Sequence, residues 1–404
     1  MNKQKLFIVA AAAGITAGVI WSCSFPGRPE PGPAGPSVTV PAVTDESGAA
    51  GEAADHWDNK AVAYSMELLY ADQFAVDYYD GGYAMITIKD SGAYLVVPEG
   101  QDIPRELPGD VTVLRQPLQN IYLAATSAMD LFVSLGGVDR ITLSGTDVSG
   151  WHIEAARQAL AEGRMLYAGK YSMPDYELIL SQACDLAVES TMIYHSPEVK
   201  EQLEQLGIPV LVERSSYESH PLGRMEWLKL YGVLLGEEEL AQSCFDEQMK
   251  ALDRVIITEP TGKTVAFFHI SSNGYVNVRK SGDYVARMIG LAGGTYVPAD
   301  LTDSETALST MNMQTESFYA SAKDADYLIY NSTIGGELDS LDELLDKSGL
   351  LADFKAVQEG RVWCTEQNMF QETMGLGGMI ADIHTILTEE DPDPANLSYL
   401  YPLH

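Results

Sequence analysis

Basic residues are scarce in this 404-residue chain. Twenty-five lysines and arginines stand against 58 aspartates and glutamates, which leaves a formal net charge of −33. This balance disfavours direct nucleic-acid binding, because phosphate contacts are made by lysine and arginine. Part of the negative charge belongs to solvated surface runs such as residues 237–239 and 389–393. The same charge disfavours a small anionic ligand unless basic side chains gather around it.

Cysteine is equally scarce, and the motifs of several enzyme classes are missing. Cys184, Cys244 and Cys364 are far apart, with no CxxC pair and no histidine at ligand spacing, so the sequence offers no zinc site. We expect each of them to be a small buried core residue. No GxGxxG opens a helix, and neither a phosphate loop nor a Gly-x-Ser-x-Gly elbow is present. The sequence therefore lacks the catalytic motifs of a doubly wound enzyme.

Residues 1–22 have the form of an export signal. Lys3 and Lys5 precede an apolar run over residues 6–20, and the run ends in the sequence Ile20-Trp21-Ser22-Cys23. A charged start, an apolar core and a small residue before the cut describe a signal peptide, and about 15 apolar residues fall short of the ~20 in a spanning helix. The cysteine resembles the acylated residue of a bacterial lipobox. The alternative is a membrane anchor with an incidental cysteine, and both place the rest of the chain outside the cytoplasm.

The segment after the signal has the composition of a linker. Residues 23–55 are mostly Pro, Gly, Ala, Ser, Val and Glu, without a helical or strand period. Such a segment buries too little apolar surface to offset its ordering entropy, so we predict a disordered tether. The roughly 350 residues that follow correspond to two domains at ~150 residues each.

Hydrophobic periodicity in the rest of the chain switches repeatedly between the periods of strands and helices. Residues 74–79, 83–89 and 93–97 predict a short antiparallel meander. From residue 121 onward strands and helices alternate, which is typical of a mostly parallel sheet with helices on its faces. We predict an α/β fold of two Rossmann-like lobes with mostly parallel sheets.

One long helical pattern interrupts this alternation. It covers residues 222–257, has Gly232 and Gly236 as its only weak points, and would reach ~50 Å as a single helix. We therefore predict an N-terminal lobe over residues 56–220, one connecting helix over 221–257 and a C-terminal lobe over 258–404.

The two predicted lobes also share a local pattern. Glu177 opens a helix and is followed by Asp185 and a strand, and Glu316 opens another helix followed by Asp326 and a strand. Equivalent construction of the two lobes explains this pattern. The alternative is that both glutamates only complement the helix macrodipole, which contributes ~0.3–1 kcal/mol each.

Taken together, these features resemble the helical-backbone (class III) substrate-binding proteins of ABC importers, which serve ferric siderophores, haem and cobalamin. The resemblance runs from about residue 117 to 387. Its most specific pieces are the sequence from Asn120 to Thr126 before Met129-Asp130-Leu131, Pro174 with Glu177, residues 206–210, Pro221-Leu222-Gly223-Arg224 with Glu226-Trp227, and Gly290 with Ala292-Gly293-Gly294.

The resemblance implies partners and an anchor. It implies a monomeric, non-enzymatic lipoprotein that is held to the membrane only through Cys23 and delivers solute to a permease dimer with its ATPase. Glu177 and Glu316 would meet arginines of that permease. The spacing behind Glu316 is ten residues against eight behind Glu177, so the second position departs from the first.

A ligand of such a protein lies in the crevice outside the carboxyl ends of the parallel strands. We therefore take candidates from the loops after strands, where aromatic and methionine side chains supply apolar contact and basic ones supply charge. They are Thr126, Trp151, Tyr171, Met192, His195 and Tyr217 in the first lobe, and His269, Tyr275, Arg279, Lys280, Met369 and Phe370 in the second. Each has a purely structural alternative as core edge, strand or solvated loop.

Three functions remain open from the sequence. The first is capture of a ferric siderophore, whose anionic groups would bind Arg279, Lys280 and Tyr275 by charge-assisted hydrogen bonds. The second is binding of cobalamin or another corrinoid, or of haem, by the same kind of importer. The third is a surface adhesin or sensor without transport. No resident cofactor or protein-bound metal is expected, because neither His195 nor His269 has a second ligand at fixed spacing.

Overall fold

The computed structural model describes residues 56–404, apart from residues 257–258, 300 and 302–309. The predicted signal peptide, the tether and Cys23 lie outside the described residues. Among the helices that are described, none combines the length and the apolar character needed to cross a membrane.

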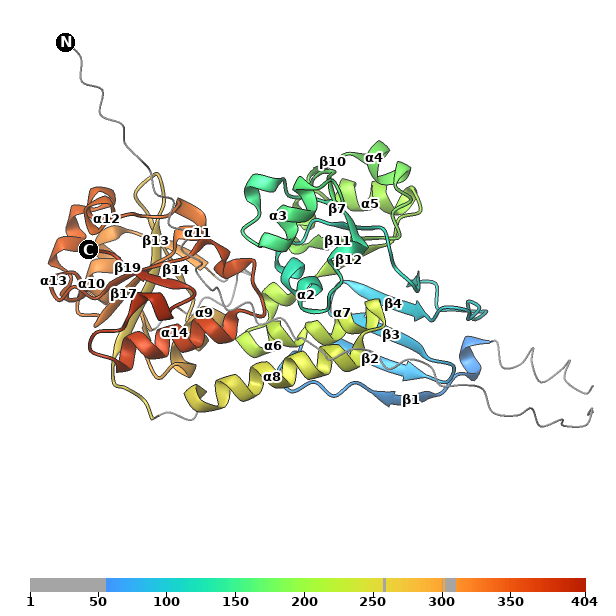
Figure 1. Cartoon of the computed structure of the whole chain (residues 1–404), viewed down its shortest axis with the longest axis horizontal. Helices are drawn as coiled ribbons and strands as arrows, with labels where there is room; N and C mark the ends of the chain where they lie inside the picture. Colours follow the sequence, from blue (N-terminus) through green and yellow to red (C-terminus); the bar gives the residue numbers. More distant parts are fainter. Residues whose placement is uncertain (1–55, 257–258, 300, 302–309) are drawn as a thin grey trace, which may run out of the picture. The chain divides into compact units, whose positions relative to one another are not determined.

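The first sheet precedes the alternating α/β region. Its five strands lie in the order β1 (Val62–Ser65), β2 (Phe74–Tyr79), β3 (Tyr83–Ile88), β4 (Gly92–Val97) and β5 (Val111–Arg115). β2, β3 and β4 pair antiparallel, which confirms the predicted meander, whereas β5 joins β4 in parallel. The turn between β2 and β3 contains Gly81 and Gly82, both at positive φ. Figure 1 shows this sheet beside helix α7 (Leu228–Leu235).

The second sheet forms the core of the first lobe. Its five strands are all parallel, in the order β12 (Val210–Glu213), β11 (Leu186–Ser190), β6 (Ile121–Leu123), β7 (Ile141–Ser144) and β8 (Leu166–Tyr167). Alternate residues of one strand face opposite cores, as a two-residue period requires. Leu186 and Val188 pack with α2 (Met129–Ser134) and α3 (Glu154–Ala161), and Ala187 packs with α4 (Tyr176–Ser181) and α5 (Pro197–Gln205).

The second lobe is built on a mixed sheet. Its described strands are β16 (Thr310–Met313), β14 (Val276–Arg279), β13 (Thr264–Ile270), β17 (Tyr327–Tyr330), β18 (Val362–Thr365) and β19 (Leu400–Pro402), in that order, with β15 (Thr295–Val297) beside β13. β13, β15, β17 and β18 are parallel, while β14, β16 and β19 run antiparallel to their neighbours. The prediction of mostly parallel sheets therefore holds for the centre of this lobe.

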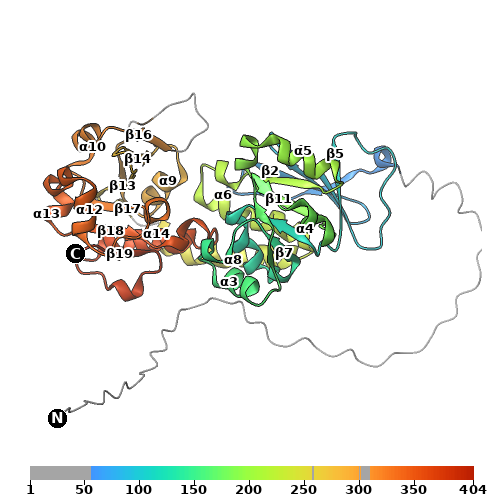
Figure 2. The ribbon, with the colours of Figure 1, turned by 90° about the horizontal axis from the view of Figure 1, so that it is seen from above.

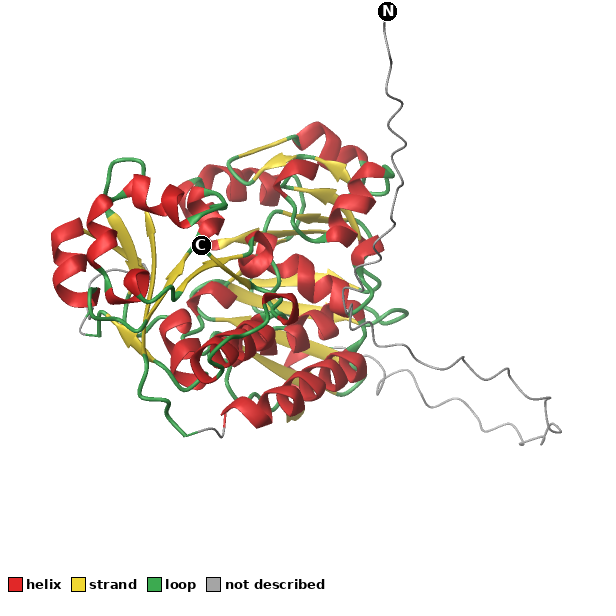
Figure 3. Ribbon diagram, turned by 60° about the vertical axis from the view of Figure 1, so that its left-hand side comes forward, coloured by secondary structure: helices red, strands yellow, loops and turns green. Residues whose placement is uncertain are grey.

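Helices cover both faces of the mixed sheet of the second lobe, as Figures 2 and 3 show. Val265 and Phe267 of β13 pack on one face with α9 (Tyr284–Leu291) and α14 (Leu376–Thr388). Ala266 and Phe268 pack on the other face with α10 (Thr315–Ala322), α12 (Leu341–Lys347) and α13 (Lys355–Gln358). The cluster on the first face continues into α2 and α7, so one apolar core joins the lobes.

The connecting segment corrects one prediction. It is three helices rather than one, namely α6 (Pro221–Glu226), α7 and α8 (Glu238–Ile256). α6 and α7 are separated at Trp227, and the break between α7 and α8 lies at Gly236, which adopts φ +72°, a left-handed conformation that favours glycine and commonly ends helices. A Cβ at Gly232 would lie 2.7 Å from Cβ of Ala241, so α7 and α8 pack closely side by side. The hydrophobic pattern continued through the break because both helices bury apolar residues.

Two buried carboxylates tie this segment to the loop of residues 69–73. Glu226 accepts hydrogen bonds from the backbone N–H groups of residues 69–71 at 2.8–3.0 Å and from Lys229 Nζ at 2.9 Å. Glu218 accepts from the N–H groups of residues 72 and 73 and from Trp227 Nε1. Charge-assisted bonds of this kind compensate for removing the carboxylates from water. They fix the first sheet to the start of the connecting helices.

The three cysteines of the folded part follow the expectation in most respects. Cys244 and Cys364 are buried, and Cys184 is half-buried behind α4.

Candidate functional site

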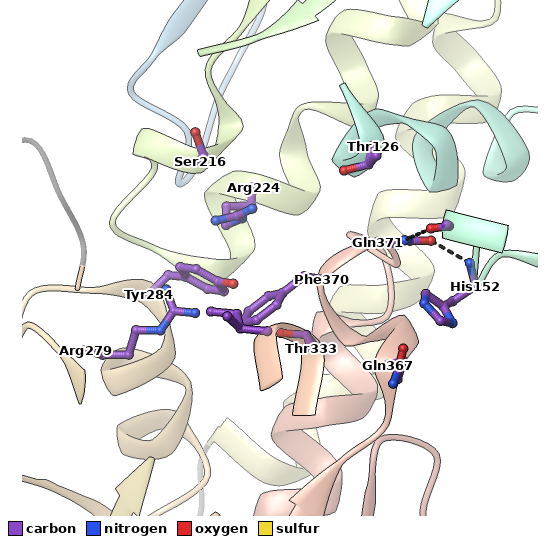
Figure 4. Close-up of a pocket in the computed structure, with 12 residues that line it drawn as sticks. Thr126, His152, Ser216, Arg224, Arg279, Tyr284, Thr333, Gln367, Phe370 and Gln371 are labelled. Carbon is purple, nitrogen blue, oxygen red and sulfur yellow. Dashed lines mark hydrogen bonds between the residues drawn. The ribbon is translucent and has the colours of Figure 1, made fainter. Parts of the chain in front are cut away.

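A pocket of about 470 Å³ lies between the two lobes. Most of its wall comes from loops that follow the carboxyl ends of parallel strands, which is where the topology places a ligand crevice. Figure 4 shows its lining, which is Thr126, Gly150, His152, Ser216, Arg224, Arg279, Tyr284, Thr333, Ile334, Gln367, Phe370 and Gln371.

Arg224 supplies one positive charge of the pocket. It belongs to α6, whose start is fixed by Pro221 in the first turn and by His220, whose Nδ1 accepts from the N–H of the second helical residue. Arg224 is only 8% exposed, and its guanidinium carbon lies 4.1 Å from the ring centroid of Tyr284. Its Nε has no hydrogen-bond partner, and the guanidinium forms no ion pair with any described residue.

Arg279 supplies a second positive charge from the other lobe. It ends β14, and the Tyr296 hydroxyl both accepts from its backbone N–H and donates to its carbonyl. Its guanidinium carbon lies 5.0 Å from the ring centroid of Phe370, and its Nη1 lies 3.8 Å from the carboxylate of Asp283. Asp283 also accepts from the backbone of Val285 at the start of α9. The charge of Arg279 is therefore shared with a structural carboxylate in direct contact, whereas Arg224 interacts only at longer range, with the buried Glu213.

The chemistry of the lining suits an anion with an apolar body. Its side chains include two arginines, two aromatic rings and several hydroxyl or amide groups, but no aspartate or glutamate. Each ring has a guanidinium over its face. A guanidinium stacked in this way presents its N–H edge to a carboxylate or another planar anion. The pocket thus gathers positive charge in a chain of net charge −33.

Three residues taken from the sequence as candidates line this pocket: Thr126, Arg279 and Phe370. Trp151 does not, because it is 2% exposed and its Nε1 donates to Ser144 Oγ and to the Thr146 carbonyl. Met369 is likewise buried in the core that joins the lobes. Both residues follow strands, as a ligand-binding residue would, but their side chains are buried in the core.

The other candidates also lie outside the lining. Lys280 and His269 are buried, and burial followed by the charge of Arg279 lowers the pKa of His269. Tyr171 packs against the core beneath α4. The remaining four, Met192, His195, Tyr217 and Tyr275, follow strands or short helices without reaching the pocket wall.

Arg224, Tyr284 and Gln371 line the pocket but were not among the residues predicted from the sequence. We searched the loops after strands, whereas Arg224 and Tyr284 lie inside helices and reach the crevice only through the packing of α6 against α9. The sequence Pro221-Leu222-Gly223-Arg224, already part of the family resemblance, was the available signal for Arg224.

Glu177 and Glu316 lie where the sequence placed them. Each is exposed in the first turn of its helix, α4 and α10 respectively, and neither belongs to the pocket. Asp175 caps α4 by accepting from the backbone N–H of Leu178 at 3.0 Å.

The described residues provide no protein-built metal centre. Nowhere in residues 56–404, with the gaps given above, are three or more His, Cys, Asp or Glu side chains placed to hold a metal ion.

The chain is similar to known proteins in both sequence and structure. No family model matches the sequence. An uncharacterized lipoprotein of Methanocaldococcus jannaschii is 25% identical over 352 residues, which cover 81% of each chain. The periplasmic haem-binding protein of Vibrio cholerae superposes with a TM-score of 0.54 at 18% identity, covering 67% of this chain and 98% of that one.

A second solved structure gives the same result. A possible iron-binding periplasmic solute-binding protein of Staphylococcus epidermidis has a TM-score of 0.53 at 15% identity and covers 67% of this chain and 99% of its own. The described chain therefore has the two-lobed α/β fold of the periplasmic solute-binding proteins.

Proposed function

We propose that this protein is an extracytoplasmic solute-binding lipoprotein that captures an anionic metal chelate, a ferric siderophore, and delivers it to an ABC permease. The observation that carries this proposal is the pair of buried guanidiniums, Arg224 and Arg279, in a pocket between the lobes whose lining has no carboxylate. Removing positive charge from water is costly unless anions compensate for it, and Asp283 in contact with Arg279 supplies only part of that compensation. A bound anion supplies that compensation.

The same observation favours a complete chelate over a bare metal ion. Two arginines repel a free cation, and the pocket offers no set of carboxylate, thiolate or imidazole ligands. The metal must then arrive with its own ligands and with excess negative charge. A volume of about 470 Å³ lies within the usual range of small-molecule pockets.

Haem is the second candidate, because its two carboxylates match two arginines and the Vibrio cholerae protein of the same fold binds haem. Burial, however, raises the pKa of Tyr284, the phenol on the pocket wall, and so disfavours the phenolate that would ligate ferric haem. Cobalamin fits less well, since its largely uncharged periphery would offer no anionic group to the buried Arg224 guanidinium.

Delivery to a permease, rather than adhesion or sensing, is supported by the exposed glutamates at the two helix starts and by the lipoprotein relative. Exposed glutamates for docking and a lipid anchor are both expected of a protein that is tethered to the membrane and binds a partner there.

Thermal melting of the mature chain with a ligand panel tests the proposal. The panel contains ferric enterobactin, ferric citrate, haemin and cyanocobalamin. A ligand at 100 times its Kd stabilises a folded protein by about 2.7 kcal/mol, so we expect a clear rise in Tm with a ferric siderophore. Stabilisation by cyanocobalamin alone, or by no member of the panel, would contradict the proposal.

A further inference from the structure

Residues 371–374, here called the strap, cross from the second lobe to the first. They lie between the short helix Gln367–Phe370 and α14. Gln371, Thr373 and Met374 all form hydrogen bonds with the first lobe. The Thr373 hydroxyl donates to the Ser127 carbonyl at 2.7 Å, and the Met374 N–H donates to Asp130 Oδ2 at 2.7 Å. The strap is therefore a hydrogen-bonded connection between the lobes in addition to the shared core.

Gln371 makes the two strap contacts that lie at the pocket. Its Nε2 donates to the Gly150 carbonyl at 2.8 Å, and its Oε1 accepts from the His152 N–H at 2.8 Å. Figure 4 shows these bonds, and all three residues line the pocket. The side-chain amide of Gln371 thus donates to one backbone carbonyl and accepts from one backbone N–H of the first lobe, as a paired β-strand does. It also completes the pocket wall.

The loop that receives Gln371 is held by hydrogen bonds within the first lobe. Asp147 accepts from the backbone N–H groups of Ser149 and Gly150, and the buried Trp151 is fixed by its two indole hydrogen bonds. The Gly150 carbonyl and the His152 N–H therefore keep their direction whether or not Gln371 is bound. Trp151 acts here by positioning the backbone on either side of it.

The other end of the strap is fixed to the second lobe. The Tyr399 hydroxyl donates to Glu372 Oε2 at 2.7 Å, and a Cβ at Gly375 would overlap that hydroxyl. Met374 is buried in the apolar core shared with α2. The contacts of Thr373 and Met374 thus lie beside the core that joins the lobes, whereas those of Gln371 lie at the pocket.

From this arrangement we infer that Gln371 is a latch between the lobes that retains bound solute. When its two bonds form, the wall between the lobes is closed, and when they break, solute can leave while the strap remains attached near the core. Two neutral hydrogen bonds contribute a small net free energy, equivalent to roughly a tenfold change in the equilibrium between the closed and the open latch. Thermal motion can therefore break and re-form them. Retention of solute rests on the proposed function, but the latch itself does not.

Hydrogen exchange of the ligand-free mature chain tests the latch directly. Gln371→Met keeps the length of the side chain and removes the amide, so the His152 N–H should exchange roughly tenfold faster than in the wild type. Gln367→Met is the matched control, because Gln367 lines the same pocket and its side chain makes no hydrogen bond with a described residue. It should leave the exchange of His152 unchanged.

Stopped-flow measurement with ferric enterobactin tests retention. Gln371→Met should speed dissociation roughly tenfold without slowing association. A lost ligand contact would also speed dissociation, but it would not alter hydrogen exchange in the ligand-free protein. Gln371→Ala provides a second variant if the methionine packs differently.

Unchanged exchange of His152 in both Gln371 variants would overturn the inference. A wild-type protein that binds no ferric chelate would instead overturn the proposed function, and the exchange experiment would still decide whether the latch exists.

Discussion

Asp185 and Asp326 make the same connection in the two lobes. Asp185 precedes β11, and its Oδ2 accepts from the backbone N–H groups of Gln119 and Asn120, just before the adjacent parallel strand β6. Asp326 precedes β17, and its Oδ2 accepts from the N–H of Thr264, the first residue of the adjacent parallel strand β13. Each carboxylate aligns the starts of two central strands. The shared sequence pattern of the lobes therefore reflects a shared structural role.

Asp326 should make the free energy of unfolding depend on pH. Burial would raise the pKa of Asp326, but hydrogen bonds from Lys355 and Thr264 outweigh it and lower the pKa to about 2. Because this pKa lies below the unfolded value, the group stabilises the fold above pH ~4, and the contribution is lost as the pH falls toward 2. Lys355→Met should lower the free energy of unfolding at pH 7 and reduce its loss on acidification.

Urea unfolding at pH 7 and at pH 3 measures this effect. Lys170→Met serves as the control, since Lys170 is exposed and makes no ion pair with a described residue. The prediction is wrong if the two variants lose the same free energy of unfolding between the two pH values.

Substitution of the pocket arginines should weaken binding of an anionic chelate unequally. Arg224→Gln should lower affinity for a ferric siderophore by about ten- to a hundredfold, because a hydrogen bond to a charged group contributes ~1.5–3 kcal/mol. Arg279→Gln should have a smaller effect, since Asp283 already compensates part of its charge. Isothermal titration measures both, with Arg157→Gln on the exposed side of α3 as the charge control. Equal affinity of Arg224→Gln and wild type would contradict the role of this residue.

Reversal of Glu177 and Glu316 should separate capture from delivery. If the two glutamates dock on permease arginines as proposed, the double variant Glu177→Lys with Glu316→Lys should abolish uptake in cells, because it would place like charges against each other. Ligand affinity and Tm should change little, since each glutamate is exposed, lies outside the pocket and contributes at most a weak helix-start interaction.

A matched control exists for this reversal. Glu198 occupies the exposed first turn of α5, so Glu198→Lys introduces the same change at a helix start elsewhere. Uptake should persist in this variant. Loss of ligand binding in the double variant would show that the two glutamates do not act only in docking.

The anchor prediction concerns Cys23. If Cys23 is acylated, Cys23→Ala should leave the body folded and move it from the membrane fraction to the soluble or uncleaved pool. Metabolic labelling with a fatty acid, followed by fractionation, measures the outcome. Lipid labelling that persists in the variant would rule out Cys23 as the anchor.

The sequence by itself determined the order and type of most elements. The meander of β2, β3 and β4 and the alternation after β6 follow from local periodicity and turn residues, which are properties of neighbouring positions. The equivalence of Asp185 and Asp326 was also visible as spacing. Arg279 could be chosen because a basic residue after a strand is conspicuous in so acidic a chain.

Only the tertiary structure decided the site. Arg224 and Tyr284 lie in different helices 60 positions apart, and their contact depends on how α6 packs against α9. The turn at Gly236 was likewise hidden, because α7 and α8 each have a helical sequence pattern and a pattern of this kind does not show where one helix ends and the next begins. Gln371 meets backbone atoms of Gly150 and His152, and backbone acceptors and donors leave no signature in the side-chain sequence. Periodicity encodes which face of an element is buried, whereas the identity of the element that buries it is settled only when the lobes pack.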